Sequence, residues 1–435
     1  MVFTKYRAKP KEGVFSRARA LFNITEGFIV LIILGTFLLL MPSSRTGEMS
    51  LIDALFVSVS ASTVTGLSPI DLSSTLSHSG FVVILVLIQL GGLGIIFYFT
   101  LFQSVLSRKG EESYIGYDKD HLEDWYRHPK YMLFTVLFCL AIELLAASLL
   151  YLYWDYDFFT SFFHAASALN NAGMTMFPNS MAGFRSNFVV MLVVPLLVVI
   201  GSLGFFVVHN TVSAALRKTK ISPYSRFVYI VTGSLIVLGI LCFLLDPAMN
   251  TGKPMERLAN SWFLSANLRT AGFSTFDNSR ISSFSILMSM IMMILGGFPT
   301  GVAGGILVTN VVIVLLFIRS KMQGKGEVTL FGRPLPERTV DAAVLILLTY
   351  MLTALAAIVL VSAFEFNKDF TLIQIAYEVI SALSTVGSSL GITSRLTLLS
   401  KVVLIMTMFI GRIGAYSFLL KFLGNKNGDS GENGD

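Results

Sequence analysis

Long apolar runs separated by short polar segments dominate the pattern along the chain. The runs FIVLIILGTFLLLM at 28–41 and FVVILVLIQLGGLGIIFYFTLF at 81–102 are long enough, as helices, to cross about 30 Å of hydrocarbon. The pattern predicts an all-α polytopic membrane protein. We expect about eight spans, at 22–41, 80–106, 130–152, 187–215, 225–245, 282–318, 339–363 and 396–422.

The predicted spans come in pairs. Each connection within a pair is moderately apolar and ends in a glycine-containing cluster, whereas charged segments separate one pair from the next. Lys and Arg number 22 in the terminal segments and between pairs, but 8 within pairs. The positive-inside rule therefore predicts cytoplasmic termini and glycine clusters on the outer side. The first run starts too far from the N-terminus for a signal peptide and has no small-residue cleavage site.

An internal repeat appears when the four connections are aligned on their glycines. The aligned segments are SASTVTG at 60–66, SALNNAG at 167–173, ANLRTAG at 266–272 and SALSTVG at 381–387. A single copy would be an ordinary loop, but four copies at one topological position are a strong signal. A short amphipathic stretch precedes each copy and reaches about halfway through a bilayer as a helix. We therefore expect four re-entrant loops around one axis, because irregular backbone at membrane depth must be buried or line a watery cavity.

The second span of each pair carries its own repeated motif. It reads GGLG at 91–94, GSLG at 201–204 and GRIG at 411–414, and it is expanded to GGFPTGVAGG at 296–305. For the three short copies we favour helix packing through small residues over a ligand site. The expanded copy contains Pro299 and five glycines, which cannot continue a straight helix. The third inner span should therefore break near the membrane centre.

The aligned glycines are suited to a cation filter. A dehydrated monovalent cation needs a shell of carbonyl oxygens, and glycine lets the backbone present them. The candidate ligands are the backbone carbonyls of Val64, Thr65, Gly66, Asn171, Ala172, Gly173, Thr270, Ala271, Gly272, Thr385, Val386 and Gly387. A potassium-channel filter has a second glycine two residues later, where this chain has Ser68, Thr175, Ser274 and Ser389. This difference predicts fewer good sites and weaker discrimination.

Two charged residues lie near the predicted filter, at a depth where charge is costly. Arg269 precedes Gly272 by three residues, and Glu378 lies in the short helix of the fourth repeat. One hypothesis is that they pair behind the filter and hold its backbone in shape. The alternative is that each has a separate local partner.

Composition excludes several function classes. The chain is 54% hydrophobic and 13% charged, and the cytoplasmic rim accounts for its net charge of +6 without nucleic acid. Cys139 and Cys242 lie in apolar runs and favour inert buried thiols, and the five histidines have no metal-ligand spacing. No nucleophile or acid pair stands at a spacing usable by an enzyme. A carrier of organic solutes is disfavoured because the repeats run in one direction and a single inner helix is expected to be broken.

With the motifs TVTGLS, NNAGM, RTAGFS and TVGSS, the chain from Asn23 to Leu423 resembles the Ktr/Trk/HKT superfamily of potassium transporters. It is most similar to the Ktr membrane (KtrB-type) subunit, since the sequence begins directly with the first repeat. The resemblance implies four linked repeats of outer helix, pore helix, filter and inner helix around one pseudo-fourfold pore, like a tetrameric potassium channel. Two positions depart from the family pattern: Ser388, where leucine is expected, and Leu307, where a basic residue is expected.

The resemblance also implies a function and partners. The function is potassium uptake across the plasma membrane, with sodium as a possible activator and no cofactor held by the chain itself. A bacterial homodimer docked on a cytoplasmic nucleotide-binding regulatory ring is expected. The alternatives are a sodium-permeable protein and an alternating-access, ion-coupled secondary transporter.

A gate is predicted below the filter. Arg412 lies in the middle of an apolar span, where a lone guanidinium costs about 2.5 to 3.5 kcal/mol, so it should face the pore and have acceptors. The broken third inner span can supply unsatisfied carbonyls for its five donors. The gate candidates are Gly296, Gly297, Pro299, Gly301, Gly304, Gly305 and Arg412. The alternative is a loop that only seals a packing defect.

These predictions divide the chain into segments. We expect a cytoplasmic N-terminal segment at 1–21, repeats at 22–106, 130–216, 225–319 and 338–423, and a disordered tail at 424–435.

Overall fold

The computed structural model describes residues 14–94, 129–249, 253–299, 301–324, 327–330 and 333–414. The first thirteen residues of the predicted N-terminal segment, the ends of the predicted first and fourth inner spans (95–106 and 415–422) and the predicted tail lie outside the described residues. Within them the fold is helical apart from one small antiparallel pair, β1 (Thr329–Leu330) and β2 (Arg333–Pro334).

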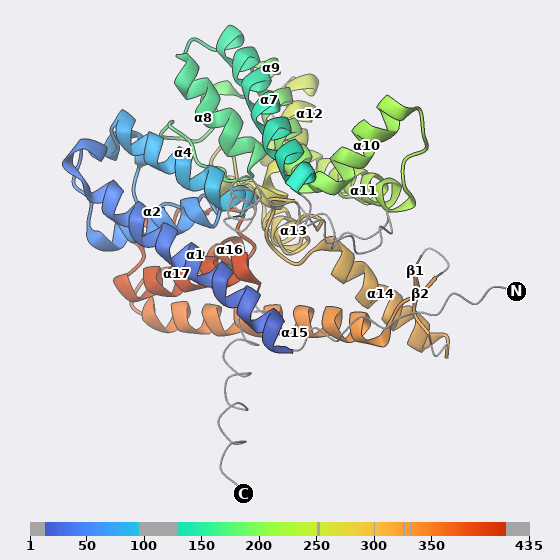
Figure 1. Cartoon of the computed structure of the whole chain (residues 1–435). Coiled ribbons are helices and arrows are strands. Elements are labelled where there is room, and N and C mark those ends of the chain that lie inside the picture. Colours follow the sequence, from blue (N-terminus) through green and yellow to red (C-terminus); the bar gives the residue numbers. More distant parts are fainter. Residues whose placement is uncertain are drawn as a thin grey trace, which may run out of the picture.

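In each quarter of the chain a long helix is followed by a short one and then by an inner helix (Figure 1). The first quarter has α1 (Val14–Leu40), α2 (Leu51–Ser62), α3 (Leu72–Thr75) and α4 (His78–Leu93). The second has α7 (Pro129–Tyr153), α8 (Phe158–Leu169), α9 (Phe188–Leu203) and α10 (Phe205–Arg217). The third has α11 (Pro223–Leu244), α12 (Pro254–Thr270), α13 (Ser283–Ile294) and α14 (Val308–Met322). The fourth has α15 (Glu337–Phe364), α16 (Leu372–Leu383) and α17 (Leu398–Ile413).

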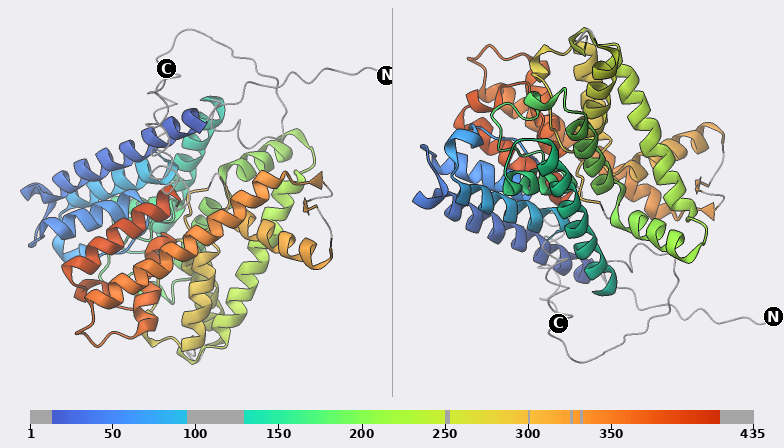
Figure 2. Two further views of the ribbon diagram at one scale, coloured as in Figure 1. Left: turned by 90° about the horizontal axis from the view of Figure 1, so that it is seen from below. Right: turned by 90° about the horizontal axis from the view of Figure 1, so that it is seen from above.

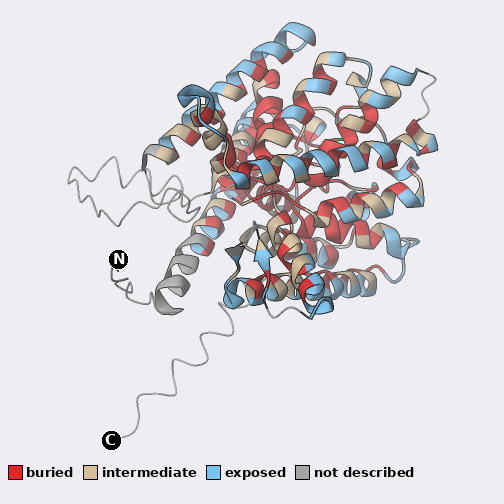
Figure 3. Ribbon diagram, turned by 90° about the vertical axis from the view of Figure 1, so that its right-hand side faces the viewer, coloured by how far each residue is buried: buried red, intermediate tan, exposed pale blue. Residues whose placement is uncertain are grey.

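The long helices carry the lipid-facing surface. Segments of α7, α11 and α15 are long and apolar enough to cross a membrane. They expose large hydrophobic side chains, among them Leu152 at 71%, Ile230 at 67% and Leu352 at 64%. Buried residues gather instead in the middle of the molecule (Figure 3). An exposed apolar surface of this extent suits hydrocarbon as solvent.

The four predicted short helices are present. Those of the first, second and fourth quarters have 12 residues each, and α12 has 17. Ser50, Asp157 and Thr371 cap three of them by accepting a hydrogen bond from a backbone N–H of the first turn. Pro254 starts α12, where its missing N–H costs nothing. Twelve residues of helix span about 18 Å, too little to cross a bilayer.

The inner helices are more broken than predicted. The predicted continuous span at 187–215 is wrong, because α9 and α10 meet at a bend of 98° at Gly204. Gly204 has a φ of +92°, which glycine alone adopts cheaply, so the helix stops there. Gly94 and Gly414 end α4 and α17 with φ of +88° and +93°. The predicted break of the third span is confirmed, since the loop that contains residues 296–305, named here the intramembrane loop, separates α13 from α14.

The predicted packing through small residues is confirmed at the first glycine of each short motif. A Cβ added to Gly91, Gly201 or Gly411 would lie 1.9, 2.0 or 2.1 Å from a carbonyl oxygen. Those oxygens belong to Ser62, Leu169 and Leu383, at the ends of α2, α8 and α16. Each inner helix therefore packs directly on the end of a short helix, which fixes the loop that follows it.

The helix α10 and the small strand pair lie at the same end of the molecule. Figure 2 shows α10 and the β1–β2 pair at one end of the molecule in both views. The loops that follow the short helices approach one another where the four quarters meet.

Candidate functional site

The four predicted filter segments leave their short helices in similar ways. In three of them the residue two before the glycine has a positive φ: 56° at Val64, 56° at Asn171 and 49° at Thr385. In those loops the next backbone N–H donates back to the helix, for example from Thr65 to the carbonyl of Ser60 at 2.8 Å. The third loop differs, because Thr270 is still the last residue of α12.

The four aligned glycines are the partly exposed members of these segments. The two residues before each glycine are buried, and the four glycines have intermediate exposure. All four glycines have positive φ values, namely 96° at Gly66, 64° at Gly173, 69° at Gly272 and 84° at Gly387. The backbone, rather than the side chains, therefore faces the space between the loops.

The four loops contact one another in a closed cycle. A Cβ on Gly66 would lie 2.2 Å from the carbonyl oxygen of Ala172, and one on Gly173 would lie 1.7 Å from that of Ala271. A Cβ on Gly272 would lie 2.3 Å from the oxygen of Val386, and one on Gly387 would lie 2.0 Å from that of Thr65. Each loop therefore approaches the next, and the fourth returns to the first. No side chain fits at any of the four positions.

The hydroxyl residues noted in the sequence close a turn at the end of each of the four segments. Two residues after each glycine, a hydroxyl oxygen accepts a hydrogen bond from the backbone N–H two residues further on. The pairs are Ser68 with Ile70, Thr175 with Phe177, Ser274 with Phe276 and Ser389 with Gly391, at 2.8 to 3.4 Å. These turns carry the chain away from the central space at the point where a channel filter would continue.

The predicted pairing of Arg269 with Glu378 is wrong. The Arg269 guanidinium donates to the Ser202 hydroxyl at the end of α9. Glu378 accepts from the hydroxyls of Ser389 and Thr393, which follow the fourth filter glycine. Local hydroxyl donors satisfy the carboxylate within its own repeat, so it does not need the arginine of the neighbouring repeat. Arg269 therefore joins the third segment to the end of α9, whereas Glu378 holds the residues that follow the fourth aligned glycine.

Ser388, the departure from the family pattern, joins two repeats. Its hydroxyl bonds to the hydroxyl of Tyr377 in α16 at 2.8 Å and accepts from the Asn278 side-chain amide at 2.9 Å. Asn278 belongs to the third quarter, so its bond to Ser388 joins the segments that follow the third and fourth aligned glycines. Leucine at this position could not make either bond.

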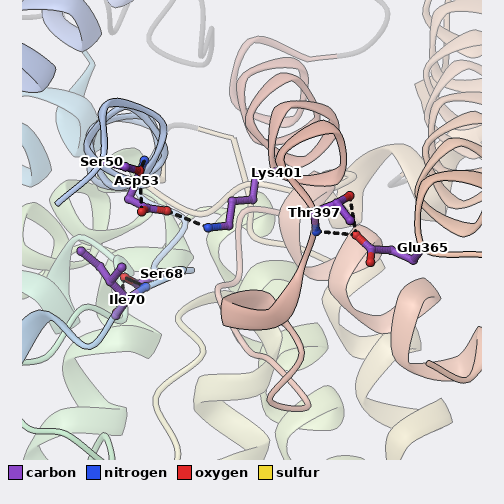
Figure 4. A network of polar contacts seen from close by, with 7 residues as sticks. All are labelled: Ser50, Asp53, Ser68, Ile70, Glu365, Thr397 and Lys401. Carbon is purple, nitrogen blue, oxygen red and sulfur yellow. Dashed lines mark hydrogen bonds and ion pairs between the residues drawn. The ribbon is translucent and has the colours of Figure 1, made fainter. Parts of the chain in front are cut away.

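An ion pair fastens the fourth quarter to the first (Figure 4). Lys401, in the first turn of α17, lies 2.7 Å from Asp53 in the first turn of α2. Asp53 also accepts from the Ser50 hydroxyl at 2.6 Å. Nearby, Glu365 at the end of α15 accepts from the backbone and hydroxyl of Thr397 at the start of α17. These contacts join α17 to α2 of the first quarter and to the end of α15.

Arg412 lies against the intramembrane loop, as expected. One guanidinium nitrogen donates to the carbonyl of Val302 in the loop at 2.5 Å. The other donates to the carbonyls of Gly91 and Gly92 in the last turn of α4, at 2.5 and 2.7 Å. The prediction placed its acceptors in the loop, whereas two of these three belong to another inner helix.

The other side of the intramembrane loop is fixed to α9. The backbone N–H of Phe298 donates to the carbonyl of Ser202 at 3.1 Å, and that of Val302 donates to Gly201 at 3.2 Å. A helix that ends leaves its last carbonyls without partners inside the helix. The breaks at Gly94 and Gly204 therefore free the carbonyls that hold Arg412 and the loop. Leu307, where a basic residue was expected, precedes the first residue of α14.

Sequence reasoning missed a buried acid beside the second filter loop. Glu143, in the middle of α7, is 1% exposed. It accepts hydrogen bonds from the side-chain amides of Gln89 and Asn170, and Asn170 directly precedes the filter residues of the second loop. An ionisable residue in the middle of a predicted span was the available signal.

Metal-ligating side chains do not cluster in the described part of the chain, where no group of three His, Cys, Asp or Glu could hold an ion. Cys139 and Cys242 are buried and unpaired.

Comparisons with known proteins find relatives that are cation transport proteins. Residues 3–430 match the family described as TrkH, cation transport protein. The chain is 32% identical over 432 residues to the potassium/sodium uptake protein NtpJ of Enterococcus hirae, covering 96% of each protein. It is 31% identical over 414 residues to the Ktr system potassium uptake protein B of Bacillus subtilis, covering 91% of each. The solved potassium transporter TrkH of Vibrio parahaemolyticus shares the fold, with a TM-score of 0.78 and 20% identity over 95% of this chain and 86% of that one.

Proposed function

Because the chain belongs to the TrkH family of cation transport proteins, we propose that it takes up potassium across the cell membrane through a channel-like pore. The relatives matched over nearly their whole length are named as potassium uptake proteins, and the chain is a transporter rather than an enzyme. The four quarters of the chain would surround one pseudo-fourfold axis.

The closed cycle of filter glycines is the observation that carries this proposal. Four backbone segments that approach within contact of one another enclose a narrow space lined by carbonyl groups, which suits a dehydrated monovalent cation. The ligands would be the backbone carbonyl oxygens of residues 64–66, 171–173, 270–272 and 385–387. The third loop would contribute less at Thr270, whose backbone remains helical. The hydroxyl turns after each glycine would shorten the filter and weaken its preference for potassium over sodium.

We further propose that the intramembrane loop and Arg412 form the gate. The loop is fixed on one side to α9 and on the other to Arg412, and Arg412 is fixed to α4. A guanidinium below the filter repels a cation and holds the loop in place at the same time. Opening would require the Val302 carbonyl to leave Arg412 and the loop to leave the end of α9.

The assembly follows from the resemblance to Ktr proteins. We propose a homodimer with both termini in the cytoplasm, regulated by a separate cytoplasmic nucleotide-binding subunit, with sodium as an activator. The end of the molecule that carries α10 and the β1–β2 pair would be the cytoplasmic end (Figure 2). Purification of the complex and its stoichiometry test this arrangement.

A second candidate, alternating access, is favoured by the helix breaks. Within the described residues, the second inner span bends by 98° between α9 and α10, and the intramembrane loop separates α13 from α14 in the third. Discontinuous helices are typical of secondary transporters. Trans-stimulation of uptake by internal potassium would favour this candidate, whereas unitary currents would favour the pore.

Substitution of Gly66 tests the proposed filter. In Gly66→Ser the new Cβ would lie 2.2 Å from the Ala172 carbonyl oxygen at a φ of +96°, so the first two loops must move apart. We expect the variant to lose potassium preference and to admit sodium, measured as uptake in a bacterium that lacks its own potassium uptake systems. Gly183→Ser is the matched control, since nothing lies within 4 Å of its added Cβ. Unchanged selectivity in a normally expressed Gly66→Ser protein would remove this loop from the ion path.

A further inference from the structure

A buried carboxylate lies directly behind the second filter loop. Glu143 in α7 accepts a hydrogen bond from Asn170 Nδ2 at its Oε1, at 3.1 Å, and from Gln89 Nε2 at its Oε2, at 2.6 Å. Asn170 Nδ2 also donates to Gln89 Oε1 at 3.3 Å. Both carboxylate oxygens accept from amide donors, as an ionised carboxylate can.

This carboxylate has no cationic partner in the described part of the chain. The ion pairs found there join Arg185 to Glu256, Arg280 to Asp277, Lys368 to Glu365 and Lys401 to Asp53. Hydrogen bonds from two neutral amides satisfy the oxygens of Glu143 but leave its charge uncompensated. A buried charge without a partner is expensive, so this position requires an explanation.

The position of Asn170 suggests why a charge is placed here. Asn170 caps the C-terminus of α8, and the filter residues Asn171, Ala172 and Gly173 follow immediately. A Cβ on Gly92 would lie 2.1 Å from Asn170 Oδ1, so this side chain is wedged between α7 and the last turn of α4. Movement of Glu143 would therefore shift both the second filter loop and the turn whose carbonyls hold Arg412.

The equivalent positions of the other loops have different support. Thr63 bonds to its own helix at the Val59 carbonyl, and Ser384 bonds to the hydroxyl of Tyr350 in α15 at 2.5 Å. Arg269 donates to the hydroxyl of Ser202. Among the four residues that stand three before an aligned glycine, the one in the second loop is thus supported by an anion, two are supported by neutral groups and one, Arg269, is itself a cation.

We propose that Glu143 is a specificity-determining residue that acts through Asn170. It fixes the second filter loop by its hydrogen bonds, and its fixed negative charge compensates a dehydrated monovalent cation held by that loop. The permeating ion is then the missing counter-charge, present only when the filter is occupied. This inference rests on the proposed ion path through the four loops.

The test separates charge from hydrogen bonding by exchanging the two partners. Glu143→Gln removes the charge and turns one acceptor into a donor that faces the amides of Gln89 and Asn170. We expect the potassium concentration for half-maximal uptake to rise about tenfold, equivalent to about 1.4 kcal/mol, with stronger competition by sodium. The double variant Glu143→Gln with Asn170→Asp restores one carboxylate and one amide in reversed order. It should recover most of the lost affinity and selectivity.

Glu365→Gln is the matched control. Glu365 is also buried, at 2% exposed, but it accepts from Thr397 and contacts no filter-capping residue. It should leave the potassium preference unchanged. If Glu143→Gln assembles and transports with the parent's affinity and selectivity, the inference is wrong. If Glu143→Gln does not assemble, the double variant decides, and a double variant that assembles without potassium preference refutes the role.

The outcome is distinguishable from failure of the proposed function. If Gly66→Ser alters selectivity and Glu143→Gln does not, the ion path stands and Glu143 has a purely structural role. If neither substitution alters selectivity, the ion path itself has been misplaced.

Discussion

Replacement of Arg412 by glutamine should open the proposed pore in the absence of the proposed cytoplasmic subunit. Among its contacts with described residues, the guanidinium donates to the carbonyl of Val302 in the intramembrane loop and to the carbonyls of Gly91 and Gly92 in α4. Opening of the intramembrane loop would break the hydrogen bond between Arg412 and the Val302 carbonyl. A hydrogen bond to a charged group contributes about 1.5 to 3 kcal/mol net. Its loss should therefore shift the balance between closed and open states by about 10- to 150-fold, at 1.4 kcal/mol per tenfold.

The assay is rubidium uptake into proteoliposomes that contain this chain without any cytoplasmic partner. Initial uptake by Arg412→Gln should exceed that of the parent at least tenfold, provided that the parent is mostly closed. Arg395→Gln is the control, because the Arg395 guanidinium lies over the ring of Phe370, 4.8 Å from its centroid, in an exposed connection. If Arg412→Gln assembles normally yet takes up rubidium no faster than the parent, Arg412 does not hold a gate closed.

Two further predictions concern the contacts that fasten the last quarter of the chain. Lys401→Met should lower the free energy of unfolding by about 1 kcal/mol, because it leaves the partly buried Asp53 without its cation. The melting temperature of the purified protein should fall, and Lys401→Asp with Asp53→Lys should recover part of it. Burial raises the pKa of Glu365, but hydrogen bonds from Ser400 and Thr397 outweigh it and hold the pKa below the ordinary value of 4.5. A depressed carboxyl pKa contributes stability that is complete above pH 4.5 and declines as the pH falls through the folded-state value. The melting temperature should therefore fall more steeply with acid in the parent than in Glu365→Gln, and parallel curves would exclude this carboxylate.

Much of the helical organisation was predictable because hydrophobic length and glycine spacing act locally. Apolar runs locate the long helices, and the caps at Ser50, Asp157 and Thr371 mark the short ones. The four aligned glycines identify the loops, because a backbone with positive φ in a crowded space requires glycine whatever the neighbours are. The predicted break around Pro299 follows from the same local rule.

The hydrogen-bond partners of the buried charged residues were not predictable, because they depend on which side chains the fold brings together. Arg269 and Glu378 were expected to pair as the two charges nearest the filter, but hydroxyl groups reach both of them first. Serine and threonine hydroxyls are too common in the sequence to be singled out as the partners of these two charges. Glu143 was overlooked for the opposite reason, since an acid within an apolar run gains its meaning only from Gln89 and Asn170, which come from other helices.

The glycine motifs of the inner helices show how one residue can serve two purposes that sequence analysis treats as alternatives. The first glycine lets the helix pack on a carbonyl at the end of a short helix, as expected, while the last ends the inner helix with a positive φ. Ending the helix frees carbonyls, and at α4 and α9 those carbonyls bind Arg412 and the intramembrane loop. The packing that fixes each filter loop and the contacts that hold the proposed gate are therefore made by the same turn of helix. A ligand that alters the spacing of the filter loops would move this turn, and the contacts of the gate would change with it.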